Sequence, residues 1–344
     1  MARPISSTEY SAVRNGGAGL LDLSSRGRMF VSGSEAVMFL NGLITNDIKT
    51  LSLDSWMPAA FANVQGRLLA AVRILHREGG FLIDTEAVTR EAVIKLLDRF
   101  TLAGDFHITD LTDERVAFSV QGDIAGTVIQ TVLGSQPAAV QRQQIVDPTL
   151  NESTVTVIRA SHTAEDGFDL LANADSAQYL RDALWAAGAF PVSSETLEVL
   201  RIEAGIPLYG IDMDETNVVT ETNLDDAVSF TKGCYVGQEI IVRIKHRGHV
   251  AKKLTGVILD GTESAPRNSK ILSGDEKEIG RVTSSTFSPT VNRAIALGYL
   301  KYDYLAPGTN VRVITPDREI RATVAELPVV RGGWFEHQPQ MNTD

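Results

Sequence analysis

The segment Phe230-Thr231-Lys232-Gly233-Cys234-Tyr235-Val236-Gly237-Gln238-Glu239, which Arg243 follows four residues later, decides the fold of this chain. It holds the only cysteine, between two glycines and two residues after a lysine. Glycine adopts positive φ without steric cost and lets the backbone approach a ligand closely. We expect a helix to begin near Tyr235 or Val236, with Ile240, Ile241 and Ile244 on its inner face.

Two features of this segment favour the thiolate of Cys234, which is the reactive form of cysteine. The thiol would face the unpaired N–H groups and the positive end of the expected helix. Lys232 would add a second positive charge. The alternative is a buried cysteine that serves only as a small apolar side chain.

The composition is that of an ordinary globular protein. The 344 residues are 43% hydrophobic and 22% charged, and at about 150 residues per domain they predict two or three domains. A formal net charge of -11 argues against general affinity for nucleic acids or anionic membranes, because both need a positive surface. One cysteine excludes disulfides within the chain and any zinc or iron–sulfur site built from the cysteines of one chain.

The sequence predicts a cytoplasmic protein. No stretch approaches the roughly 20 apolar residues of a membrane span, and residues 1–25 lack the apolar core of a signal peptide. The cysteine content also suits a reducing compartment.

The periodicity predicts a mixed fold. Apolar runs between residues 58 and 120 alternate with one helical pattern, 87–100, which indicates an α+β sheet with a helix on one face. Residues 194–204 predict a second helix, with Ser194 as its cap. After about residue 250 the helical period is lost, and short strands between Gly and Pro turns predict a small β-barrel or sandwich.

The motif Lys-Gly-Cys-Tyr-Val-Gly-Gln-Glu with Arg243 downstream resembles the signature of the YgfZ-type proteins, folate-binding relatives of the glycine-cleavage T-protein that support iron–sulfur cluster enzymes. The resemblance extends over most of the chain. Segments similar to T-protein superfamily patterns are Tyr10 to Asp22, Gly33 to Asp47, Asn63 to Gly66, Thr163 to Phe168, Leu200 to Gly210, Gly280 to Ser284, Phe287 to Pro289 and Ala296 to Tyr299.

This resemblance implies an α+β fold in which three domains form a ring around a central cavity for tetrahydrofolate, with a C-terminal β-barrel. The expected limits are 1–50 together with 151–245 for a discontinuous folate-binding domain, 51–150 for an α+β, ferredoxin-like domain, and 250–332 for the barrel.

The chain departs from the T-protein pattern at two places. T-protein enzymes follow the Asn-x-x-Gly turn with an acidic pair, one of whose aspartates assists chemistry at the folate nitrogen. The corresponding positions here are Ala70 and Ala71, and a methyl group can neither accept a proton nor stabilise a cation. T-proteins also have Phe-Ile-Gly-Arg-Glu in place of residues 235–239 and lack the cysteine. Asp84 is the alternative acid, although it lies more than ten residues from the expected position.

The resemblance also implies folate-binding residues. It places the glutamate that recognises the pterin at Glu203, where a carboxylate could accept from the amino group and the adjacent N–H in parallel. The alternative for Glu203 is a salt bridge to Arg201 or to another arginine. Arg243, Tyr209, Gln238 and Asn63 are the other expected folate-binding residues, although Asn63 could equally make a local turn.

A basic segment follows the motif. Between residues 243 and 253 there are five basic residues, Arg243, Lys245, Arg247, Lys252 and Lys253, and no acidic one. It would attract the glutamate tail of folate or an RNA backbone, or it is simply a solvated surface. His246 and His249 do not predict a metal site, because Gly248 interrupts the helix that would align them and no carboxylate is near.

The sequence therefore predicts a tetrahydrofolate-binding protein that assists iron–sulfur cluster assembly, maintenance or repair, with iron–sulfur proteins or their assembly machinery as partners. Cys234 and Lys232 would carry the chemistry. The alternatives are a folate-dependent aminomethyltransferase and a tRNA-associated factor.

Overall fold

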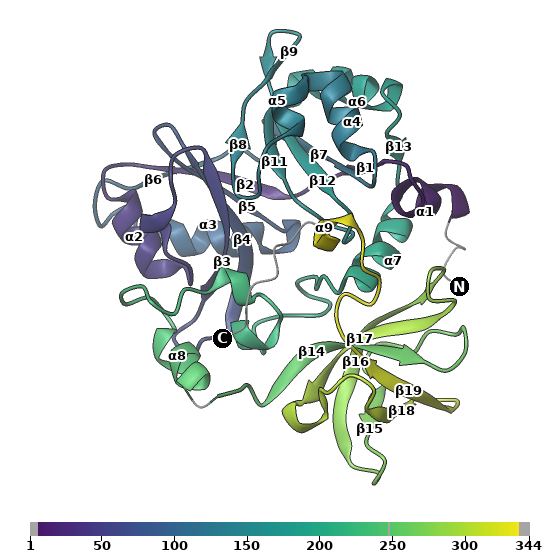
Figure 1. The fold of residues 1–344 in the computed structure, drawn as a ribbon. Coiled ribbons are helices and arrows are strands. Elements are labelled where there is room, and N and C mark those ends of the chain that lie inside the picture. Colours follow the sequence, from purple (N-terminus) through teal and green to yellow (C-terminus); the bar gives the residue numbers. More distant parts are fainter. Residues whose placement is uncertain (1–5, 247, 337–344) are drawn as a thin grey trace.

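The computed structural model describes residues 6–246 and 248–336, which form two layered α/β regions and a β-barrel (Figure 1). Within these ranges, no helix has the length and apolar character that a bilayer span requires.

The first sheet is antiparallel, with the strand order β3-β4-β5-β2-β6. Helices α2 (Ala36–Leu43) and α3 (Arg90–Asp98) pack on one of its faces. Ala70, Val72 and Ile74 of β4 point into this apolar layer, so the alternating residues Ala71, Arg73 and Leu75 point to the other face. The strands are β2 (Gly27–Ser32), β3 (Ser55–Ala62), β4 (Leu68–Arg77), β5 (Gly80–Thr85) and β6 (His107–Asp110).

The second sheet has the order β13-β1-β7-β12-β11-β8 and is antiparallel except for the β1–β13 pair. Helices α4 (Ala125–Leu133) and α6 (Ala177–Ala186) cover one face, and the short α5 (Ser135–Ala138) follows α4. The strands are β1 (Gly19–Asp22), β7 (Arg115–Gln121), β8 (Ile145–Val146), β11 (Thr156–Arg159), β12 (Gly167–Asn173) and β13 (Phe190–Pro191), with a small hairpin of β9 (Thr149–Leu150) and β10 (Ser153–Thr154) beside them.

The uncovered faces of the two sheets meet. Leu75 of β4 packs in one cluster with Ile145 and Ile158 of the second sheet, and Arg73 forms an ion pair with Asp169 of β12. The interface between the sheets is therefore apolar at one end and charged at the other.

Helix α7 (Ser194–Ala204) connects the second sheet to the barrel and packs on α1 (Ser7–Arg14). The predicted helix 194–204 is confirmed, but its cap is Ser193. The Ser193 hydroxyl accepts from the Thr196 N–H at 3.3 Å, whereas the Ser194 hydroxyl donates to Glu195.

The predicted C-terminal β-barrel is confirmed as a closed barrel with the order β14-β17-β16-β15-β18-β19. Helix α8 (Gln238–His246) precedes it, and α9 (Gly333–Glu336) follows it and lies between the barrel and the sheets (Figure 1). The strands are β14 (Lys252–Leu259), β15 (Lys270–Leu272), β16 (Glu278–Ser288), β17 (Arg293–Lys301), β18 (Asn310–Ile314) and β19 (Glu319–Ala325).

Sheet membership does not follow the expected limits at residues 50 and 150. β2 lies before residue 50 but pairs with β5 and β6, and β7 lies within 51–150 but pairs with β1 and β12. The domain division stays a prediction, while the α+β class with a C-terminal barrel is confirmed.

Candidate functional site

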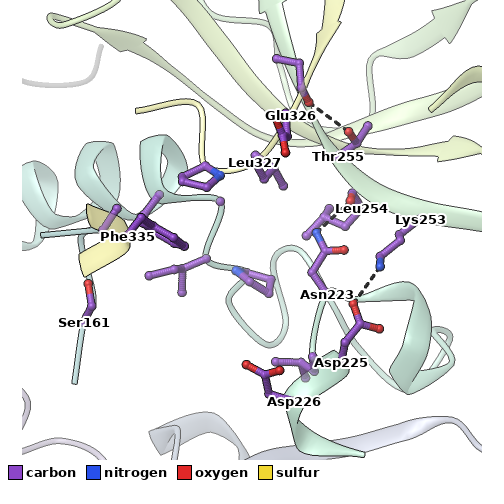
Figure 2. A pocket seen from close by; sticks show the side chains of 18 of the residues that line it. Ser161, Asn223, Asp225, Asp226, Lys253, Leu254, Thr255, Glu326, Leu327 and Phe335 are labelled. Atoms are coloured by element: carbon purple, nitrogen blue, oxygen red, sulfur yellow. Dashed lines mark hydrogen bonds and ion pairs between the residues drawn. The ribbon is translucent and has the colours of Figure 1, made fainter. Parts of the chain in front are cut away.

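A pocket of about 700 Å³ opens where the two sheets, the end of α7 and the barrel meet. Its apolar wall includes Leu224, Leu254, Leu327 and Phe335, as Figure 2 shows in part. Pro58 of β3 also lines it, so all three regions of the fold contribute.

The polar residues of the pocket are mostly paired. The Asn223 amide donates to the Leu254 carbonyl at 2.9 Å, and the Lys253 ammonium donates to Asp225 at 2.8 Å (Figure 2). Asp226 differs, because only its backbone carbonyl is bound, by the Asn46 amide at 3.0 Å. Within the described ranges its carboxylate has no partner, so it is available to a ligand.

The end of the chain closes one side of this pocket. Trp334 and Phe335 of α9 line it, and the backbone N–H of Trp334 donates to the Ala164 carbonyl at 3.2 Å. The Arg142 guanidinium stacks on the Trp334 ring at 3.7 Å, and Glu165 accepts from the Gly333 N–H at 2.9 Å. These contacts fix α9 against the second sheet.

Cys234 lies elsewhere, on a loop before α8, and its thiol is exposed. The prediction of a helix start at Tyr235 or Val236 is wrong, because α8 begins at Gln238. Gly237 has φ +85°, which no helical residue adopts, and the Val236 N–H is bound to the Gly42 carbonyl. Cys234 therefore lies outside the first turn of α8, and the expected help from that helix terminus does not apply.

Lys232 anchors the N-terminal end of the loop that carries Cys234. Its buried ammonium donates to three backbone carbonyls at the end of α2, those of Asn41 at 2.6 Å, Ile44 at 3.0 Å and Asn46 at 2.7 Å. Burial lowers the pKa of Lys232 to about 8. All three donors of the ammonium are used, so the structure gives Lys232 a positioning role. Its influence on the thiol stays a prediction.

Gly237 anchors the other end of the loop, against the turn Asn63–Gly66. A Cβ on Gly237 would lie 2.5 Å from the Asn63 carbonyl oxygen and 3.0 Å from the Gly66 Cα. The side chain of Asn63 accepts from the N–H groups of Gln65 and Arg67. Asn63 therefore makes the local turn that the sequence left as an alternative to folate binding.

Gly237→Ala should lower the free energy of unfolding by at least about 2 kcal/mol, because it adds a backbone clash to an unfavourable φ. Gly79→Ala is the matched control, since Gly79 has φ +79° but nothing within 4 Å of an added Cβ. It should cost only about 1 kcal/mol. Urea unfolding of the two variants measures the difference, and equal losses would contradict the close approach.

Glu203 does not face the pocket. Its carboxylate is fully buried and accepts from Tyr10 at 2.7 Å, from Ser288 and from the Arg14 guanidinium at 2.9 Å. Both oxygens are occupied, so this geometry supports the salt-bridge alternative and not pterin recognition. The partner is Arg14 and not Arg201, which binds Glu198 and Asp212 instead.

The other expected folate-binding residues are dispersed. Tyr209 is half-buried, and its N–H donates to Glu86 at 3.1 Å. The Gln238 amide contacts the Lys232 carbonyl at 3.5 Å and so spans the Cys234 loop. Arg243 is exposed on α8. None of the three is among the residues that line the central pocket.

Ala71 and Asp84 lie on the face of the first sheet that meets the second sheet, which we call its inner face. Ala71 packs with Tyr209 in an apolar cluster. Asp84 is buried and bound by the guanidinium groups of Arg26 at 2.9 Å and Arg73 at 2.7 Å. Despite burial, these two charges lower the pKa of Asp84 to about 2, so Asp84 is too weak a base to replace the missing acidic pair.

The basic segment is partly neutralised. Lys252 lies 3.9 Å from Glu221 and Lys253 binds Asp225, whereas Lys245 is exposed on α8. Arg247 lies outside the described residues. In the part of the chain that the structure describes, no three His, Cys, Asp or Glu side chains are grouped to hold a metal ion.

Three residues that the structure brings to attention were not predicted from the sequence. Asp226 lines the pocket, Arg14 binds Glu203, and His162 binds Asp169. The acidic pair Asp225-Asp226, which precedes an apolar run, is the sequence pattern that could have indicated Asp226. No local pattern indicates the pairs Arg14–Glu203 and His162–Asp169, because the two members of each pair lie on different elements.

Comparisons with known proteins agree with this fold. Residues 2–232 match the family model described as the GCVT N-terminal domain, and residues 252–330 match the glycine cleavage T-protein C-terminal barrel domain. An aminomethyltransferase of Rubrobacter xylanophilus is 32% identical over 326 residues, which cover 94% of this chain and 86% of that protein. One of Geobacillus kaustophilus is 30% identical over 94% of this chain and 90% of its own length.

A solved structure shares the fold. The crystal structure of the glycine cleavage system aminomethyltransferase T from Bartonella henselae has a TM-score of 0.83 and 22% identity, with 94% of this chain and 89% of that chain covered. The two family models together span both the sheets and the barrel. This chain belongs to the glycine cleavage T-protein family.

Proposed function

We propose that this chain binds tetrahydrofolate in the central pocket and acts through Cys234 in the assembly, maintenance or repair of iron–sulfur proteins. The observation that carries the proposal is the exposed thiol of Cys234 on a loop that Lys232 and Gly237 fix at both ends. This loop is the segment that resembles the YgfZ-type signature.

The pocket fits a folate. Its volume of about 700 Å³ lies within the roughly 300–1,000 Å³ of small-molecule sites. Leu224, Leu327 and Phe335 offer apolar surface for flat rings, and the free carboxylate of Asp226 can accept from an amino group and a ring N–H (Figure 2). Tetrahydrofolate supplies one-carbon chemistry when bound.

A titration with tetrahydrofolate tests the binding half of the proposal. Wild type should bind saturably, and Asp226→Asn should bind about 10-fold more weakly, because the neutral amide loses a charge-assisted hydrogen bond. Asp123→Asn, at an exposed position outside the pocket, is the control and should bind as wild type does. Absence of saturable binding would refute the folate claim, and equal affinities would exclude Asp226 as a contact.

Aminomethyl transfer is the second candidate. It is favoured by the aminomethyltransferases that are 30% and 32% identical over 94% of this chain. Against it stands Ala71 on the inner face of β4, where the resemblance places an acid, since neither Ala71 nor the arginine-bound Asp84 can take up a proton there. Ammonia release from an aminomethyl donor distinguishes the two candidates. An aminomethyltransferase would accelerate this release, whereas the proposed iron–sulfur function predicts no acceleration.

A further inference from the structure

A second cleft, of about 460 Å³, opens on the barrel. It is lined by residues of three neighbouring strands, β14, β16 and β17, and shares no residue with the central pocket. Three of its lining residues are cations, Lys252, Arg281 and Lys301. The lining also includes Tyr299, whose side chain is buried, and one acidic residue, Glu278.

The strand register brings the three cations to one face of the barrel. Lys252 of β14 is paired with Lys301 of β17, and Arg281 of β16 is paired with Tyr299 of β17. Lys301 and Tyr299 point to the same side of β17, because side chains two residues apart on a strand share a face. Leu297, two residues earlier, packs against α7 on this outer face. The cleft includes no residue of α7, so the cations lie at the end of the face that this helix leaves open.

The lining itself neutralises these charges poorly. Arg281 is exposed and has no ion pair or hydrogen bond within residues 6–246 and 248–336. The Lys301 ammonium donates to the backbone carbonyl of Glu278 at 2.9 Å, which carries no charge. The Glu278 carboxylate is itself bound by Lys270 at 2.8 Å. The one acid of the lining is therefore already paired with a cation outside the cleft.

The acids behind the cleft leave an excess of positive charge. Glu221 lies 3.9 Å from the Lys252 ammonium, which is too far for a hydrogen bond. Asp214 attracts Lys252 and Arg281 from a longer distance. Lys252 and Lys301 stand directly opposite each other on adjacent strands, an arrangement that like charges make unfavourable. An anion bound between them would remove this repulsion.

We propose that this cleft binds a phosphate group, either free phosphate or the phosphate of a small phosphate monoester. A phosphate carries nearly two negative charges and three acceptor oxygens at neutral pH, which suits three cations better than a single carboxylate does. The guanidinium of Arg281 offers parallel N–H donors that match two phosphate oxygens, and the two lysines add point charges. The Lys252 ammonium lies 5.0 Å from the centre of the Tyr299 ring, which supports it from below. This site is independent of the proposed folate binding.

Calorimetric titration with inorganic phosphate at low ionic strength tests the proposal. Wild type should bind one equivalent, and Arg281→Gln and Lys301→Gln should each bind at least about 10-fold more weakly, because each loses a charge-assisted hydrogen bond. Arg281→Gln should keep the wild-type midpoint of urea unfolding, since the guanidinium has no partner in the described residues. Arg99→Gln is the control. It makes the same change of charge at an exposed arginine outside the cleft and should bind as wild type does.

Two further probes, ribose 5-phosphate and a single-stranded RNA oligonucleotide, identify the source of the phosphate. Tighter binding of ribose 5-phosphate than of phosphate supports a phosphate monoester as the ligand, and equal binding supports free phosphate. If neither binds saturably, or if Arg99→Gln weakens binding as much as Arg281→Gln does, the proposal is overturned. Binding of the oligonucleotide alone also overturns it, because the surface would then recognise a nucleic acid. None of these titrations contains tetrahydrofolate, so their failure leaves the proposed function untouched.

Discussion

Asp84→Asn should lower the free energy of unfolding by about 3–5 kcal/mol, the cost of removing one partner from a buried ion pair. Asp84 is 1% exposed and binds Arg26 and Arg73, with the Arg28 Nε 4.0 Å away. An amide leaves these guanidinium groups to repel one another inside the protein. Urea unfolding measures the loss, provided that the slope with denaturant is unchanged.

Asp54→Asn is the matched control, since Asp54 binds Arg77 at 2.8 Å but is half exposed. It should cost less than about 1 kcal/mol. Equal stability of the two variants would show that the buried cluster contributes no more than a surface pair.

The pH dependence has a definite sign. The pKa of Asp84 is about 2 in the folded chain, below the ordinary 3.8, so the unfolded chain binds the proton more tightly. The stability that Asp84 contributes is fully present above pH 3.8 and is lost as the pH falls through 2. Asp84→Asn should therefore be less sensitive to acid than wild type over this window.

Cys234→Ser should abolish the support of iron–sulfur enzymes while leaving stability and folate affinity unchanged. The thiol is exposed and makes no disulfide, and a hydroxyl of similar size cannot act as a soft metal ligand or as a thiolate nucleophile. The measurement is the activity of an iron–sulfur enzyme in cells that lack the wild-type chain and express the variant.

Thr231→Ala is the control for this loop, because Thr231 is exposed three residues away. It should restore the enzyme as well as wild type. Restoration by Cys234→Ser to the same level would remove the thiol from the mechanism.

The sequence predicted those features that depend on local patterns. Short strands between turns indicated the barrel, and helix 194–204 followed from its period and its cap region. The glycines around Cys234 predicted positive φ, which Gly237 adopts, but its close approach to the Asn63 carbonyl was not predicted. The same Gly237 delays α8 to Gln238, which the apolar period alone could not show.

Partners that are distant in sequence could not be predicted. Glu203 lies on the expected helix, but its carboxylate is bound by Arg14, 189 residues earlier. The pairing of Arg73 with Asp169 spans 96 residues and joins two sheets. Lys232 precedes Cys234 by two residues, yet its ammonium is bound to the carbonyls at the end of α2. Such contacts depend on how the sheets and helices pack, which no local pattern encodes.

Folate-dependent ammonia release from an aminomethyl donor is the measurement that tests the central claim most directly. With Ala71 on β4 and Asp84 bound by two arginines, we expect release at the rate observed without the protein. Robust folate-dependent turnover that Cys234→Ala retains in full would contradict the account and identify the chain as an aminomethyltransferase.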